Sequence, residues 1–191
     1  MKKEIATALA LVGVLALAGC EKVSDVTYDD PGSMTVSKDW SDTDIRAAAG
    51  ELGADLAAHP AVAGAKSRPK ILALRIKNKT SKRLNTSIII SQIETRLLRT
   101  GKVEFIDGAA RPELAKEYEY MASGMVDPKE QKGPGKQAGA DYVLWGTIEN
   151  VEARQGKDKV DYYYIKLTLV SVERNTKVWQ GEKETKKRIR K

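Results

Sequence analysis

The sequence predicts a single α/β domain with a mixed β-sheet flanked by about four helices and a C-terminal antiparallel β-meander. Between residues 41 and 122, apolar residues repeat at helical spacing in some segments and form strand-like runs in others. After residue 141, strand patterns follow one another, separated by two turn sequences. Helices interleaved with strands and then successive hairpins are typical of one domain with a mixed sheet.

The first part of this domain alternates helix and strand patterns. A helix is expected to begin at Ser41 or Asp42, which are good capping residues, and to end before Pro60. The nearly continuous apolar run 70–76 predicts a central strand buried on both faces. A second helix is expected from about Thr86. Its apolar side and its terminating glycine are predicted to be Ile89, Ile90, Ile93, Leu97, Leu98 and Gly101.

Shorter elements are expected in the middle of the chain. Residues 103–106 have the composition of a short strand. A third helix is predicted over 113–122, with Pro112 in its first turn. A fourth and very short helix is expected around Gln131 or over 136–138.

The last part of the domain is predicted to be a three-stranded meander. Strand patterns cover 142–148, 162–172 and 177–181, and the segments 154–159 and 174–176 carry the turn residues between them. In the long middle strand, alternation places on one face Tyr163, Ile165, Leu167 and Leu169.

The first twenty residues have the features of a bacterial lipoprotein signal. Two lysines at positions 2 and 3 precede an uncharged run of small and apolar residues over 5–18. This run is shorter than the ~20 residues that a membrane-spanning helix needs. It ends in the sequence Leu17-Ala18-Gly19-Cys20, which resembles a lipobox. We therefore predict cleavage before Cys20 and acylation, for example with palmitate, of this new first residue.

The residue after the cysteine bears on localisation. Two or three acyl chains make an effectively permanent anchor, because each buried CH₂ contributes ~0.8 kcal/mol. In lipoproteins of this type an Asp after the cysteine often marks retention at the inner membrane, and Glu21 stands here instead. We expect the protein at the outer membrane, lipid-anchored and facing the periplasm.

The chain is expected to have four segments: a signal peptide over 1–19, a lipidated N-terminus and flexible tether over 20–38, a globular domain over 39–186, and a basic tail over 187–191. The last ten residues hold six Lys or Arg and two Glu, which is +4 of the net charge of +7. A nucleic-acid-binding domain more often spreads its basic residues over one face. We therefore expect no nucleic-acid partner.

The sequence contains no recognisable catalytic or metal-binding motif. Cys20 is the single cysteine and is taken by the lipid. His59, the single histidine, precedes a proline at an expected helix end and is expected to be a cap or a surface residue. No phosphate-binding loop, zinc-binding helix or nucleophile elbow occurs. We expect a protein that is not an enzyme and needs no cofactor. Trp145 and Trp179 are predicted to be structural residues of neighbouring strands, with Tyr162 and Tyr164 sharing one strand face.

The order and spacing of four segments in the globular part are specific enough to indicate a family resemblance. The segments are Asp39-Trp40, residues 84–103, the "QAGADYVLWG" sequence over 137–146, and the hairpin over 164–181 that contains "NTKVWQG". In this order and spacing they resemble the LpoB family, the outer-membrane lipoproteins that activate class A penicillin-binding proteins. The resemblance runs from Asp39 to about Lys186.

This resemblance implies a periplasmic domain without an active site. Its partner would be a class A penicillin-binding protein, a peptidoglycan synthase whose regulatory domain is reached through the cell-wall mesh. The implied role is in peptidoglycan synthesis and cell shape. An allosteric activator must bind the active state of its target more tightly than the inactive one.

The expected tether differs from that of the family, and related folds suggest an alternative function. Family members carry a long, proline-rich tether, whereas residues 21–38 are few and contain a single proline, Pro31. Related folds occur in the amino-terminal domain of TolB and in CsgG-like lipoproteins of curli secretion. A secretion, assembly or structural role in the envelope is therefore the alternative to synthase activation.

Overall fold

The computed structural model describes residues 30–31, 33, 37, 39–135 and 137–190. The chain divides into two units, 1–33 and 34–191. In the described part of the first unit, the Ser33 N–H donates to the carbonyl of Asp30 at 2.9 Å. The second unit contains every helix and strand given below. The predicted signal peptide and most of the predicted tether lie outside the described residues.

A five-stranded mixed sheet forms the centre of the second unit, in the order β2-β1-β3-β4-β5. β1 pairs in parallel with β2 and β3, whereas β3, β4 and β5 are antiparallel neighbours. This arrangement confirms the predicted mixed sheet and C-terminal meander. The strands are β1 (Lys70–Asn78), β2 (Glu104–Phe105), β3 (Tyr142–Gln155), β4 (Asp158–Ser171) and β5 (Thr176–Ile189).

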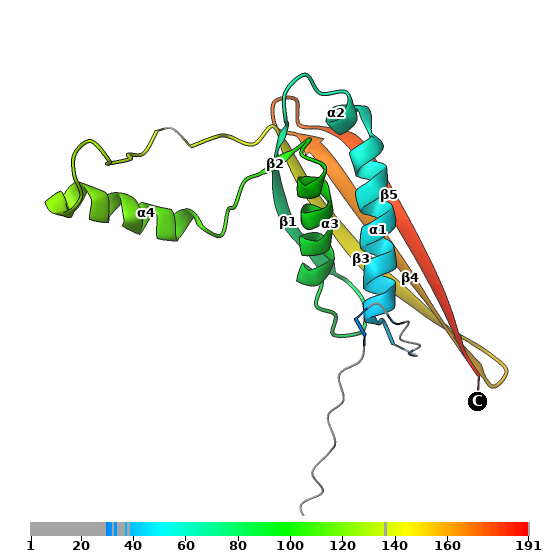
Figure 1. Ribbon diagram of the computed structural model, residues 1–191. Helices are drawn as coiled ribbons and strands as arrows, with labels where there is room; N and C mark the ends of the chain where they lie inside the picture. Colours follow the sequence, from blue (N-terminus) through cyan, green and yellow to red (C-terminus); the bar gives the residue numbers. More distant parts are fainter. Residues whose placement is uncertain (1–29, 32, 34–36, 38, 136, 191) are drawn as a thin grey trace, which may run out of the picture. The chain divides into compact units, whose positions relative to one another are not determined.

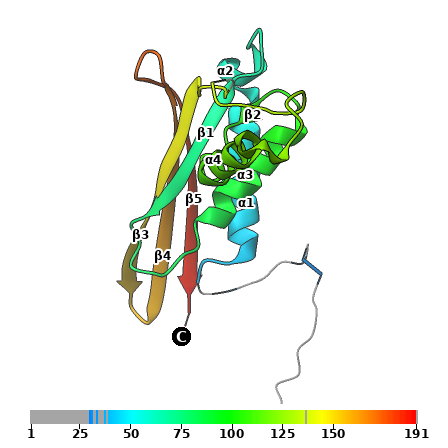
Figure 2. The ribbon, with the colours of Figure 1, turned by 90° about the vertical axis from the view of Figure 1, so that its left-hand side faces the viewer.

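Two long helices pack on one face of this sheet. α1 (Asp42–Ala58) and α3 (Ser87–Arg99) lie on the same side of it (Figure 2). The N–H of Ser41 donates to the Asp44 carboxylate at 2.7 Å, so the helix start that the sequence predicts is confirmed. α1 ends at Ala58, before Pro60, also as predicted.

The shorter helices differ in part from the prediction. α4 (Arg111–Tyr120) has Pro112 in its first turn, as expected, and continues into a π-helix, Met121–Met125. The fourth helix, however, is α2 (Pro60–Ala63), and His59 caps it by accepting a hydrogen bond from the Ala61 N–H at 3.2 Å. In the described residues of 131–138 the chain forms turns and extended segments, because Gly and Pro over 133–135 disfavour a helix.

α3 confirms most of its predicted apolar side. Ile89, Ile90, Ile93 and Leu97 are buried, and Gly101 follows the helix with φ +67°. Leu98 is the exception, since 50% of it is exposed. Each helical residue is turned by ~100° from the previous one, so Leu98 falls outside the stripe that its neighbour Leu97 completes.

β1 is buried on one face, and the prediction of burial on both faces was wrong. Ile71 and Ile76 are buried, but Leu74 is 46% exposed. The register of β1 against β3 shifts between Ala73 and Ile76, which is a bulge. Bulges redirect the side chains that follow them. The two long helices cover only one side of the sheet, so β1 has a layer above one face alone (Figure 1).

The hydrophobic core lies between this helix layer and the sheet. The predicted face of β4 is confirmed, because Tyr163, Ile165, Leu167 and Leu169 are fully buried. They pack in one cluster with apolar residues of both long helices, such as Leu52 of α1. All buried members of this cluster fall within residues 48–179, so the core that the described residues form lies in the unit 34–191, and we expect this unit to fold by itself.

β5 is much longer than the predicted strand 177–181. It extends to Ile189, so residues 187–189, which the sequence analysis placed in a basic tail, continue the strand. These residues stay in the strand because they pair with β4, where Lys159 lies opposite Ile189. Since the pairing partner is a distant part of the chain, the sequence at the end of β5 shows no apolar pattern that would predict it.

Candidate partner-binding surface

The sheet face that points away from α1 and α3 is here called the open face. Strand alternation assigns residues to it, and the pairings of β3, β4 and β5 align them in rows across the strands. From β3 it includes Val143, Trp145, Thr147, Glu149 and Val151. From β4 and β5 it includes Tyr162, Tyr164, Lys166, Thr168, Val170, Gln180, Glu182, Glu184 and Lys186.

Three aromatic residues lie on the open face. Tyr162, Tyr164 and Trp145 are each half-buried. The prediction that Tyr162 and Tyr164 share a face is confirmed, because Tyr163 between them points to the core. There its ring lies 5.1 Å from that of Trp40. Tyrosine and tryptophan are the residues most enriched in protein interfaces, since they offer large rigid contact areas with a polar tip.

The charges of the open face are arranged around these aromatic residues. Glu149 pairs with Lys79 at 2.8 Å, and this contact holds the pKa of the Glu149 carboxyl below its usual value. A hydrogen bond to Glu182 raises the pKa of Tyr164 to about 12, so its phenol stays protonated at neutral pH. Lys166 lies between Thr147 and Glu182 in the adjacent strands. Aromatic contact area and charges of both signs therefore occur together on this face.

The two tryptophans do not occupy the positions predicted for them. β4 separates the strands that carry Trp145 and Trp179, so they are not in neighbouring strands. Trp179 is on the core face with 7% exposed, and its indole N–H donates to Asp55 at 3.0 Å. Its structural role is supported. Trp145 lies on the opposite face, where a partner could reach it.

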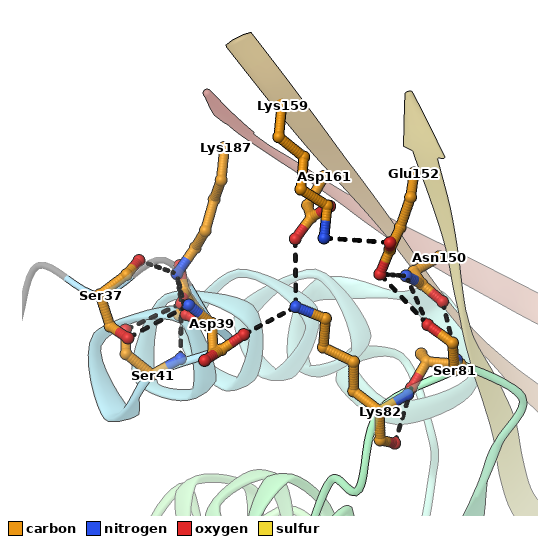
Figure 3. A network of polar contacts seen from close by, with 12 residues as sticks. Ser37, Asp39, Ser41, Ser81, Lys82, Asn150, Glu152, Lys159, Asp161 and Lys187 are labelled. Carbon is orange, nitrogen blue, oxygen red and sulfur yellow. Dashed lines mark hydrogen bonds and ion pairs between the residues drawn. The ribbon is translucent and has the colours of Figure 1, made fainter. Parts of the chain in front are cut away.

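A second group of polar residues, here called the polar cluster, lies where the chain enters the domain (Figure 3). Its centre is Asp161, which is fully buried. The ammonium of Lys82 lies 3.2 Å from one oxygen of this carboxylate, and that of Lys159 lies 3.3 Å from the other. Lys82 also reaches Asp39 at 2.6 Å, and this bond is the largest cause that raises the pKa of Lys82.

Lys187 connects the same entry segment to the end of β5. Its ammonium donates to the backbone carbonyls of Ser37 at 3.2 Å and Asp39 at 2.6 Å, and to the carboxylate of Asp44. Lys82 and Lys187 thus connect Ser37 and Asp39 to α1, β4 and β5. Each oxygen of the Asp161 carboxylate has an ammonium as ion-pair partner, although Oδ1, which faces Lys159, makes no hydrogen bond to the described residues. These partners come from within the domain, so we interpret the polar cluster as structural.

The sequence analysis missed the polar cluster although β4 carries a signal for it. Asp161 stands two residues before Tyr163, in the same alternation as the buried residues Ile165 and Leu167. A carboxylate in register with a core face has to find buried cations as partners. Which lysines would supply them is not visible in the sequence, because Lys82 and Asp161 are 79 positions apart.

The predicted lipidation site, Cys20, and the lipobox residues Leu17, Ala18 and Gly19 lie outside the described residues. Within the described part, no group of three or more His, Cys, Asp or Glu side chains could hold a metal ion. Of the helices in that same part, none is long and apolar enough to span a bilayer.

Comparison with known families gives one match. The family model described as the peptidoglycan-synthase activator LpoB matches residues 44–185, which is more than half of the chain. The matched segment begins within α1 and ends within β5, so it covers the sheet and both helices that pack on it. No curated protein matches the sequence.

Several solved structures are similar to this chain at low identity. The LpoB C-terminal domain from Salmonella enterica is 16% identical with a TM-score of 0.46, covering 74% of this chain and 98% of its own. That from Escherichia coli is 15% identical with a TM-score of 0.43, covering 72% and 97%. Lipoprotein GNA1162 from Neisseria meningitidis is 19% identical with a TM-score of 0.41, covering 63% and 83%.

Proposed function

Because the chain belongs to the LpoB family of peptidoglycan-synthase activators, we propose that it is an outer-membrane lipoprotein that binds a class A penicillin-binding protein and raises its activity. In this proposal Cys20 carries the lipid anchor, and the unit 34–191 is the activating domain. The protein performs no chemistry itself. It acts by binding the active state of the synthase more tightly than the inactive state.

We place the synthase contact on the open face. The observation that carries this assignment is the group of three half-buried aromatic residues, Trp145, Tyr162 and Tyr164, on a sheet face that α1 and α3 leave uncovered. Binding energy in protein interfaces is concentrated in a few such residues surrounded by polar contacts. Lys166, Glu149 and Glu182 would supply that polar surround and the orientation of the partner.

The test uses the unit 34–191 and the class A synthases of the same organism. The purified unit should bind one of them in solution and stimulate its glycan polymerisation, because the lipid serves only to position the domain. Trp145→Ala or Tyr164→Ala should each weaken binding at least tenfold, as expected for central interface aromatics. Melting temperatures of the variants separate this loss from unfolding.

A matched control is available on α4. Tyr120 is an exposed aromatic residue outside the open face, so Tyr120→Ala should leave binding and stimulation unchanged. Equal losses in the Tyr120 and Tyr164 variants would refute the assignment of the surface. If the unit neither binds nor stimulates any of the class A synthases, the activator assignment fails. A ring-shaped oligomer in mass photometry would then favour the secretion or assembly alternative.

A further inference from the structure

The end of the sheet at which the β3–β4 turn lies is also the end at which Ser37 and Asp39 contact β5. The two-residue turn after Gln155 and the C-terminal end of β5 lie together there, since Lys159 of β4 is opposite Ile189 (Figure 1). Lys187 in the same part of β5 binds the carbonyls of Ser37 and Asp39. Ser37 and Asp39, the first described residues of the unit 34–191, therefore lie beside this end.

This end carries an excess of positive charge. Three of its cations are in ion pairs: Lys159 with Glu152 and Asp161, Lys187 with Asp44, and Arg188 with Asp158. Four others are exposed and have no ion pair within the residues that the structure describes. These four, here called the basic end, are Arg154, Lys157, Lys186 and Arg190. Glu184 is the one carboxylate of the same strand ends that likewise has no ion pair there.

We propose that the basic end docks on the anionic phospholipid headgroups of the membrane that holds the lipid anchor. The proposal rests on the lipid attachment at Cys20 proposed above, which places the domain near a bilayer. Ser37 lies seventeen positions after Cys20, with sixteen residues between them. As a flexible coil this segment spans about 23 Å, and fully extended at most about 60 Å. The end of the domain next to the tether is thus the end that a short tether holds nearest to the membrane.

The chemistry of the basic end suits headgroup phosphates. Lysine and arginine side chains bind phosphate oxygens by charge-assisted hydrogen bonds. Near an anionic surface each such residue strengthens binding about fivefold, and this attraction decays over a Debye length of about 10 Å at 0.1 M salt. Val151, which is 63% exposed, lies near this end of β3, and it adds an apolar contact at headgroup depth.

The experiment is sedimentation of the unit 34–191 with vesicles, because this unit lacks Cys20 and cannot insert a lipid. At 50 mM salt it should bind vesicles of phosphatidylcholine with 25% phosphatidylglycerol, and not vesicles of phosphatidylcholine alone. Raising the salt to 0.5 M should release it. The variant R154Q/K157Q/K186Q/R190Q should bind at least a hundredfold more weakly, since four fivefold contributions are removed.

The control variant removes four exposed cations elsewhere and has the same net charge. K66Q/R68Q/K102Q/K129Q should keep vesicle binding within a few fold. If this control loses as much binding as the first variant, the effect is non-specific, and the proposal fails. Absence of binding to the anionic vesicles, or equal binding to neutral ones, also overturns it. Synthase stimulation in solution uses no membrane, so its failure would refute the proposed function and not the docking.

Discussion

Asp161 shows how a single buried charge organises one end of this domain. It stands on the core face of β4 and is fully buried, yet Lys82 and Lys159 approach its two oxygens. A buried ion pair contributes little net stability compared with apolar packing, but removing one partner is costly because the other charges stay buried. The value of Asp161 therefore lies in holding the loop that carries Lys82 against β4.

We expect Asp161→Asn to destabilise the unit 34–191 by about 2–3 kcal/mol, measured by urea unfolding. The cost is below that of an isolated buried charge, because Lys82 keeps Asp39 and Lys159 keeps Glu152 as partners. Glu113→Gln is the matched control, since its ion pair with Lys116 is exposed on both sides. An unchanged midpoint for the Asp161 variant would show that the polar cluster does not contribute to stability.

Glu94 of α3 gives a pH-dependent prediction. Its pKa is raised above the usual value, first by desolvation and then by the nearby charge of Asp107. The folded state then binds more protons than the unfolded state between the normal and the raised pKa, so stability falls as pH rises through that window. Glu94→Gln removes this penalty. Its melting temperature should exceed that of the parent at pH 7.5 and approach it at pH 4; an equal difference at both pH values would contradict the prediction.

At the scale of elements, the sequence predicted those features of helices and strands that depend on neighbouring residues. The capped start of α1, the glycine at the end of α3 and the buried face of β4 follow from residues within one turn or one strand. The length of β5 and the bulge in β1 depend on pairing with distant strands, so their own residues carry no sign of them. The open face was not predicted because β4 has large residues on both sides, Tyr163 on one and Tyr164 on the other.

Gly146 and Gly139 differ in how much space an added Cβ atom would have. Gly146 lies in β3 against β4, and a Cβ added there would approach the carbonyl oxygen of Lys166 at 2.4 Å. Because this contact is with backbone, the strands themselves would have to separate. We expect Gly146→Ala to destabilise the domain by about 2–3 kcal/mol in thermal or urea unfolding.

Gly139, seven positions earlier, provides the control. No atom lies within 4 Å of a Cβ added at this position, so Gly139→Ala should leave the unfolding midpoint nearly unchanged. If the two substitutions had similar effects, the close approach of β3 and β4 would not be the cause, because the general effect of alanine on the unfolded chain is stabilising. A large effect of the Gly146 variant alone would identify the close approach of β3 and β4 as its cause.

At the scale of the whole molecule, the proposed anchor and the proposed binding surface are separate. The core and the open face belong to the unit 34–191, whereas Cys20 lies before it. In this arrangement the lipid sets where the domain acts, and the open face sets what it binds. The anchor stays a prediction, and the sequence alone suggests it because its motif is contiguous. The sequence could not locate the binding surface, which combines side chains from three strands.

This separation predicts that the length of the tether matters more than its sequence. The segment 22–36 precedes Ser37. The carbonyl of Ser37 accepts a hydrogen bond from the ammonium of Lys187. Replacing 22–36 with Gly/Ser residues of equal number should retain function in cells that lack the native copy, because the reach of a flexible coil sets the effective concentration at the target. Deleting 22–36 should abolish it. Growth, cell shape and fatty-acid labelling of Cys20 are the measurements.

The outcome separates a passive tether from a binding element. If the equal-length replacement fails although the protein is stable, labelled and at the outer membrane, residues 22–36 themselves contact the partner. If the deletion variant still functions, the synthase reaches the lipoprotein without help from its tether, and reach is not limiting. The purified domain 37–191 should stimulate the synthase equally in both cases, since it contains neither the lipid nor the altered segment. The tether acts through its length alone if function in cells depends on the length of segment 22–36 and stimulation in solution is preserved.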